Sequence, residues 1–129
     1  MKSLLLISIA LLAGCANQDQ WTRDDTVWQG ILVATMVADG IQTARIQDHP
    51  NIIEKGPVAR AFLGQNPSTA DVVMYMTTLS ITHYLVARAL PRGWRTIYQV
   101  SNIWFHADAV NRGHQLGLWS EPCTVNACE

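Results

Sequence analysis

Residues 72–90 read VVMYMTTLSITHYLVARAL and carry no charged residue before Arg88. Their length and apolar character are typical of a helix that is buried in a protein or in a membrane. Pro91 and Gly93 end this helix, because proline cannot continue it. Ser68 and Asp71 stand before it with the S-x-x-D spacing of a capping box. The sequence therefore predicts a helix that begins close to Ser68.

Two further segments, one on each side, also predict helices. Residues 26–46 read TVWQGILVATMVADGIQTARI, with a cap expected from Asp24, Asp25 or Thr26. Residues 94–112 form a third helix, which is more polar. Strand-like alternation is not sustained anywhere, so the predicted fold class is all-α, a small bundle of three main helices anchored by an N-terminal lipid.

Side-chain spacing gives the first helix two expected faces. Its apolar side consists of Trp28, Ile31, Leu32 and Met36. Its polar stripe consists of Thr35, Asp39, Gln42 and Thr43.

A Pro-rich connector separates the first two helices. Residues 47–70 contain three prolines, which exclude one continuous helix. The piece GPVARAFLG, residues 56–64, predicts a short helix with Pro57 in its first turn and Gly64 after its last. After the third helix, the tail from Gly113 is expected to be a loop.

The N-terminus predicts an export signal. Lys2 is followed by an apolar run over residues 4–12, which is too short for a membrane span of about 20 residues. The next residues, Leu12-Ala13-Gly14-Cys15, resemble the lipobox of bacterial lipoproteins, in which Cys15 carries the lipid and becomes the mature N-terminus. A plain secretory signal or a short anchor helix are the alternatives. In the same pattern, Ala16 after the cysteine favours the outer membrane over the inner membrane.

These features predict four segments along the chain: a signal peptide over residues 1–14, a tether over 15–24, a helical domain over 25–118 and a tail over 119–129. The tail contains Cys123 and Cys128 in CTVNAC. In an oxidising periplasm this pair predicts a small disulfide loop. Two free thiols, or half of a metal site near His114, are the alternatives. The formal net charge of −1 argues against nucleic acid as a partner.

The bundle itself has two interpretations. It is either a periplasmic domain that touches the membrane, which we favour, or a two-span hairpin formed by the first two helices. Three spans are disfavoured because they would place Cys123 and Cys128 in the reducing cytoplasm.

Several polar residues within the apolar helices form a candidate polar site. It consists of Asp39, Gln42, Glu54 and His83, with His106 and Asp108 as further titratable neighbours. A buried carboxylate beside a histidine often marks function. A structural pairing of Asp39 with His83 or with an arginine is the stronger interpretation. The sequence contains no HExxH motif, no G-x-S-x-G motif and no Gly-rich phosphate loop. No catalytic residue, metal ligand or cofactor is predicted, and an enzyme is the less expected outcome.

Residues 38–68, ADGIQTARIQDHPNIIEKGPVARAFLGQNPS, resemble a motif of small uncharacterised lipoproteins of proteobacteria and their phages. The family pattern is D-x-x-Q-T, a histidine-proline, E-x-N-P, L-G-x-x-P-S and a tyrosine in the next helix. Here it falls on Asp39, Gln42, Thr43, His49, Pro50, Glu54, Leu63, Gly64, Pro67, Ser68 and Tyr75. This chain departs from the pattern at Gly56, where the family has asparagine, and in the inserted VARAF. The resemblance implies a small, helical, membrane-associated envelope protein and allows a phage or prophage origin, but it implies no activity.

The expected function is therefore that of an envelope lipoprotein, anchored by lipid at Cys15, which acts by protein or membrane contact. Its expected place is the outer membrane facing the periplasm, with the inner membrane as alternative, and its expected partner is another envelope protein. One alternative is a small metal-binding protein or hydrolase that uses Asp39, Glu54 and His83. Another is an accessory of phage superinfection exclusion or lysis, and a third is a subunit of a membrane complex.

Overall fold

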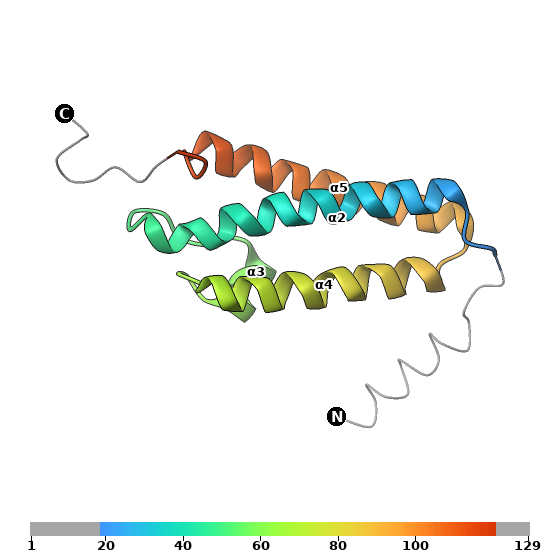
Figure 1. Ribbon diagram of the computed structural model, residues 1–129, viewed down its shortest axis with the longest axis horizontal. Helices are drawn as coiled ribbons and strands as arrows, with labels where there is room; N and C mark the ends of the chain where they lie inside the picture. The colour runs from blue at the N-terminus through green and yellow to red at the C-terminus, as the bar shows by residue number, and fades with distance from the viewer. Residues whose placement is uncertain (1–18, 121–129) are drawn as a thin grey trace, which may run out of the picture.

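The computed structural model describes residues 19–120, so the predictions on Cys15, Cys123 and Cys128 lie outside the described residues. Three long helices, α2 (Arg23–Arg45), α4 (Thr69–Ala89) and α5 (Arg92–Gln115), pack into an elongated bundle (Figure 1). A 3-10 turn, Ile46–Asp48, and the short helix α3 (Pro57–Leu63) lie in the connector. The described part contains no strand, so the predicted all-α bundle of three main helices is confirmed.

The contacts between helices define their directions. α2 and α5 run in the same direction, because Asp25 pairs with Arg95 near their beginnings and Gln42 bonds Val110 near their ends. α4 runs beside α2 in the opposite direction, since the chain turns back at each connection (Figure 1). One end of the bundle therefore contains the beginnings of α2 and α5 and the end of α4.

The beginnings of α2 and α4 are fixed by side-chain caps. Thr22 caps α2, where the Asp25 amide donates to Thr22 Oγ1 at 3.2 Å and the Thr22 amide donates to Asp25 Oδ2 at 2.8 Å. The helix thus begins earlier than the expected cap at Asp24–Thr26, because a complete capping box already satisfies these amides at Thr22. Ser68 caps α4 as predicted, with the Asp71 amide donating to its hydroxyl at 3.2 Å.

Glycines close two of the helices. Gly64 follows α3 with a φ of 78°, and its amide donates to the carbonyl of Arg60, which confirms the predicted short helix. The expectation that the tail is a loop from Gly113 is wrong, because α5 continues to Gln115. Gly113 is buried inside this helix, where a larger side chain would collide with Gln42. The left-handed backbone occurs later, at Gly117, with a φ of 79°.

The buried positions of the bundle hold more polar or charged residues than large apolar ones. Six apolar residues are buried in the described part, namely Leu32, Met36, Ile46, Val72, Ala87 and Leu118. Eight polar or charged residues are buried with them: Asp25, Gln29, Gln42, Thr43, His83, Arg95, Gln99 and His106. The expected apolar side of the first helix is therefore only partly right, since Leu32 and Met36 face inward but Ile31 is 40 % exposed.

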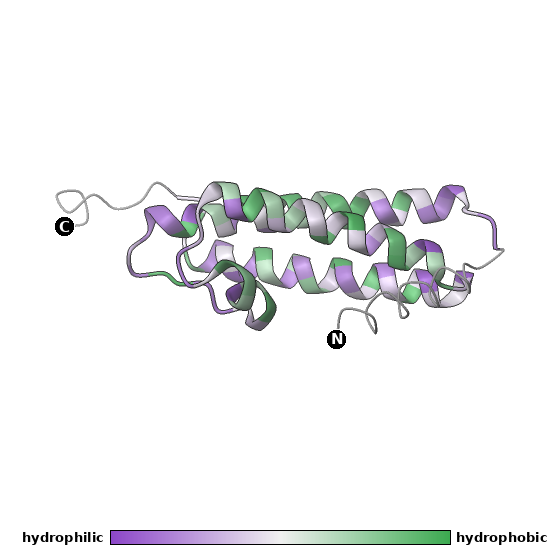
Figure 2. Ribbon diagram, turned by 90° about the horizontal axis from the view of Figure 1, so that it is seen from below, coloured by the Kyte–Doolittle hydropathy of each residue, from purple (hydrophilic) through white to green (hydrophobic). Residues whose placement is uncertain are grey.

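Large apolar side chains are also exposed on the outside of α2, α4 and α5. Figure 2 shows that hydrophobic residues are distributed along all three of these helices. Nineteen large hydrophobic residues are exposed in the described part, and those on the three long helices are Val27, Ile31, Val33, Val37, Ile41, Val73, Met74, Ile81, Tyr84, Leu85, Trp94, Ile97, Val100, Trp104 and Phe105. Within residues 19–120, no single helix combines the length and the mean hydropathy that crossing a membrane requires.

Candidate functional site: a polar interior

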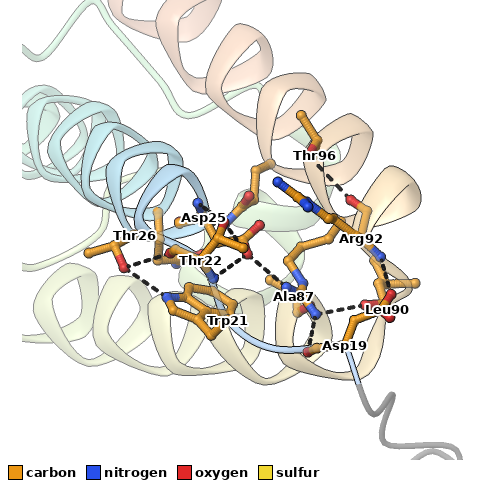
Figure 3. Close-up of polar contacts among 12 residues, drawn as sticks. Asp19, Trp21, Thr22, Asp25, Thr26, Ala87, Leu90, Arg92 and Thr96 are labelled. Atoms are coloured by element: carbon orange, nitrogen blue, oxygen red, sulfur yellow. Dashed lines mark hydrogen bonds and ion pairs between the residues drawn. The ribbon is translucent and has the colours of Figure 1, made fainter.

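A buried ion pair joins the first turns of α2 and α5. Arg95 Nη1 donates to Asp25 Oδ2 at 2.8 Å, and both side chains are almost fully buried. Arg95 also donates from Nε to the Ala87 carbonyl at 2.9 Å and from Nη2 to the Leu90 carbonyl at 3.2 Å. One guanidinium thus fixes α2, α5 and the end of α4 (Figure 3). Planar, multiply bonded charge recognition of this kind is characteristic of arginine.

Opposing influences act on the Asp25 carboxyl. Burial raises its pKa, because desolvation disfavours the charged form. Hydrogen bonds from the Thr22 amide and hydroxyl, together with the Arg95 charge, lower it further than burial raises it. The pKa of Asp25 is therefore below its ordinary value, and the carboxylate is held in its charged form.

Trp21 covers this ion pair from outside. Its indole N–H donates to Thr26 Oγ1 at 2.9 Å, and its ring lies 5.2 Å from the guanidinium carbon of Arg95. The guanidinium of Arg88 lies 5.3 Å from the same ring. These cation–π contacts attach the segment before α2 to the other two long helices at this end of the bundle.

Glutamines continue the polar interior one turn further along. Gln99 Nε2 donates to the Asp25 carbonyl at 3.2 Å and to Gln29 Oε1 at 3.1 Å. Gln99 Oε1 and Gln29 Nε2 are buried without a hydrogen-bond partner. Unsatisfied polar atoms of this kind cost about 1–3 kcal/mol each, so this layer is the least satisfied part of the interior together with Gln42.

The middle of the bundle contains two hydrogen-bonded pairs, called the histidine pairs here, each formed by one histidine and a partner on another helix. His106 Nδ1 lies 2.7 Å from Asp39 Oδ2 and donates to this carboxylate. His83 Nδ1 lies 2.5 Å from the Tyr98 hydroxyl, and the His83 and His106 rings meet edge to face at 6.1 Å between centroids. The expected pairing of Asp39 with His83 or an arginine is thus wrong. Asp39 and His106 meet because α2 and α5 are parallel, while His83 enters from α4.

The environment sets the protonation of the second pair. Burial lowers the pKa of His83, and the neighbouring His106 lowers it further. Burial raises the pKa of Tyr98, so the phenol keeps its proton. A neutral His83 therefore accepts a hydrogen bond from the Tyr98 hydroxyl.

Gln42 and Glu54 form hydrogen bonds that include neither of these histidine pairs. Gln42 Nε2 donates to the Val110 carbonyl at 3.0 Å, while its Oε1 is buried without a partner. Glu54 accepts from the Gly56 amide at 2.6 Å and stabilises the connector. Burial raises the pKa of Tyr75, and the charges of Asp39 and Glu54 raise it further. Among the described residues, no hydrogen bond or ion pair joins any two of Asp39, Gln42, Glu54 and His83.

The chemical capacity of this interior is limited. Neither His83 nor His106 bonds a serine, threonine or cysteine in the described part of the chain. Across residues 19–120, no three His, Cys, Asp or Glu side chains gather closely enough to hold a metal ion. A surface groove between α2 and α4 is apolar and has no titratable residue in its lining. The lining consists of Met36, Val37, Gly40, Ile41, Ala44, Thr69, Val72, Val73, Met76 and Thr77. The hydrogen bonds and ion pairs of the polar interior therefore connect the helices to one another.

Several members of the interior were not identified from the sequence, above all Asp25, Arg95, Gln99 and Tyr98. A signal for them exists in the spacing. Asp25, Gln29, Leu32 and Met36 follow one another at helical intervals, and Arg95, Gln99, Asn102 and His106 repeat the same intervals. Two helices whose facing residues have the same spacing can pack in parallel, as these two do.

Comparison with known proteins adds no relative. No protein-family model, no curated protein and no solved structure matches the chain.

Proposed function

We propose that this chain is a lipid-anchored protein of the bacterial cell envelope that acts by contact with protein or membrane and not by catalysis. The observation that carries the proposal is the exposure of large apolar side chains on all three long helices. Exposed patches beyond a few hundred Å² mark interaction sites in most folded proteins. Trp104 and Phe105, which are 70 % and 53 % exposed, are residue types that anchor interfaces.

The location follows from the predicted lipid site. Cys15 precedes Asp19 by four residues, which can reach about 14 Å at most when fully extended. A lipid at Cys15 would therefore keep the bundle close to the membrane surface. Ala16 supports the outer membrane as the destination, with the lipid in the leaflet that faces the periplasm. Superinfection exclusion would be one form of such contact if the chain has a phage origin.

Lipidation is tested by metabolic labelling with palmitate. The wild-type chain should carry label, and Cys15→Ala should carry none. Cys123→Ala is the matched control, because it removes a cysteine outside the lipobox and should keep the label. An unlabelled wild-type chain, or a labelled Cys15→Ala variant, would contradict the proposed anchor.

Contact is tested by site-specific photo-crosslinking in cells. A photoreactive residue in place of Trp104 should give adducts with protein or lipid. The control position is Asn111, which is exposed on the same helix but polar. Equal absence of adducts from both positions would contradict action by contact.

A further inference from the structure

We infer that lipid acyl chains cover the middle of this bundle. The outward apolar side chains there form what we call the apolar belt, defined by Val33, Val37, Ile81, Ile97, Val100 and Trp104. The inference rests on the proposed function and names the partner of its contact surface.

The first argument is that the apolar belt extends over every long helix. α2 exposes Val37 at 55 %, α4 exposes Ile81 at 56 % and α5 exposes Ile97 at 57 %. The buried residues of these three helices contact one another in a common interior, so the exposed faces of the helices point to different sides. A single protein partner would cover one side and leave the others in water. A fluid apolar phase covers all of them.

The second argument is the distribution of charge. Residues 26–44 of α2 contain one charged side chain, Asp39, whose side chain is only 16 % exposed and bonds His106. Residues 72–87 of α4 contain no Asp, Glu, Lys or Arg, and neither do residues 96–107 of α5. Charged residues gather at the two ends of the bundle, with Arg23, Asp24, Arg88 and Arg92 at one end and Arg45, Asp48, Asp71 and Arg112 toward the other. An uncharged middle between charged ends matches hydrocarbon between headgroup layers.

The length of this uncharged section suits contact with acyl chains. At 1.5 Å per residue, the three charge-poor segments measure about 28 Å, 24 Å and 18 Å. The hydrocarbon core of a bilayer is about 30 Å thick, so the apolar belt fits within it. The predicted lipid at Cys15 lies within four residues of Asp19, at the end of the bundle where this section starts. The anchor would thus bring the apolar belt to the hydrocarbon.

The third argument is the pairing of polar groups inside. In hydrocarbon, polar side chains are stable when they face other helices and bond one another. Asp25 with Arg95, Asp39 with His106 and His83 with Tyr98 do this here, each pair joining two helices. The mean hydropathy of a helix is lowered by these inward polar side chains. Lipid around the bundle would contact only the outward side chains.

The test is depth-dependent quenching of tryptophan fluorescence. The mature, lipidated full chain is reconstituted in phosphatidylcholine vesicles that contain either lipid brominated deep in the acyl chain or lipid with a headgroup nitroxide. Trp104→Phe should remove most of the emission that the bromolipid quenches. Trp119→Phe is the matched control, because Trp119 is also exposed but follows α5. It should leave the bromolipid effect unchanged.

A charge placed in the apolar belt gives a second readout. Ile81→Arg should reduce bromolipid quenching of Trp104, because an arginine resists transfer into hydrocarbon. Val58→Arg is the control, since Val58 is equally exposed at 57 % but lies on α3. Circular dichroism verifies that both variants remain helical.

The outcomes separate the two proposals. If mass measurement shows the acylated chain and Trp104 emission is still the same in brominated and plain lipid, acyl chains do not cover the apolar belt. The inference is then wrong while the proposed function stands. If the chain is not acylated at all, the proposed function fails. Bromolipid quenching that Trp104→Phe largely removes and Ile81→Arg reduces, while both control variants keep it, supports the inference.

Discussion

The Arg95 guanidinium and the Asp25 carboxylate meet at 2.8 Å with side-chain exposures of 1 % and 3 %, although 70 positions separate them in the sequence. Few contacts in this fold link segments so distant with so little exposure to water. The pair joins the first turns of α2 and α5, and the carbonyls of Ala87 and Leu90 bring the end of α4 to the same guanidinium. The Arg95 side chain therefore joins all three long helices at this end of the bundle.

Replacing that side chain should be costly. Arg95→Met keeps apolar volume but leaves the Asp25 carboxylate buried without its partner, which costs about 3–5 kcal/mol in comparable sites. Arg92→Met, on the exposed side of the same helical turn, should change stability by less than about 0.5 kcal/mol. Denaturant unfolding followed by circular dichroism measures both. Equal stability of the two variants would show that the ion pair does not hold the bundle.

Two glycines of α5 should respond to alanine in opposite directions. A Cβ on Gly113 would lie 2.5 Å from Gln42 Oε1, inside a buried contact, so Gly113→Ala should destabilise the fold by about 1–3 kcal/mol. A Cβ on Gly93 meets nothing within 4 Å, and alanine is the better helix former by about 1 kcal/mol. Gly93→Ala should therefore stabilise. Thermal unfolding of both variants checks the pair, and a Gly113→Ala variant as stable as Gly93→Ala would contradict the packing.

The helices were predictable from local signals, whereas their pairing was not. Ser68, Pro57 and Gly64 act at the positions that local rules assign to them, because a cap or a turn depends on only a few neighbouring residues. The partner of Asp39 depends on which helices run in parallel, and no local rule contains that information. The same holds for the polar interior, because a hydropathy pattern assigns the apolar face of a helix to the inside. Ile31 was therefore assigned to the buried side and is found outside.

The buried histidine on α4 should make stability depend on pH. The pKa of His83 is lowered in the folded state by burial and by His106, while in the unfolded chain it has its ordinary value of about 6.5. A group with a lowered folded pKa contributes stability above the unfolded pKa and loses it as the pH falls toward the folded pKa. The free energy of unfolding should thus decrease below about pH 6.5, by up to about 1.4 kcal/mol per pH unit for this one proton.

The matched variants for this pH dependence are His83→Gln and His114→Gln. His83→Gln removes the titrating ring and should flatten the decrease between neutral and mildly acidic pH. His114→Gln, at an exposed position of α5, should keep the wild-type slope. Unfolding curves at several pH values give the comparison, and an unchanged slope in His83→Gln would place the acid sensitivity elsewhere.

The pair formed by Asp39 and His106 can show whether the polar interior contributes to the stability of the fold. Both groups are largely buried, and their contact joins α2 to α5, so a double-mutant cycle with Asp39→Asn and His106→Gln should give a coupling energy of about 0.5–3 kcal/mol. The reference cycle uses Asp108 and Arg112, an exposed i,i+4 pair on α5, whose coupling should be only about 0.3–0.5 kcal/mol. Similar couplings for the two pairs would mean that the interior pair stabilises no more than a surface contact. A larger coupling for the interior pair would show that this polar contact stabilises the packing of α2 against α5, a role that apolar contacts have in most bundles. Such stabilisation is expected if the exposed apolar side chains bind a partner outside the bundle.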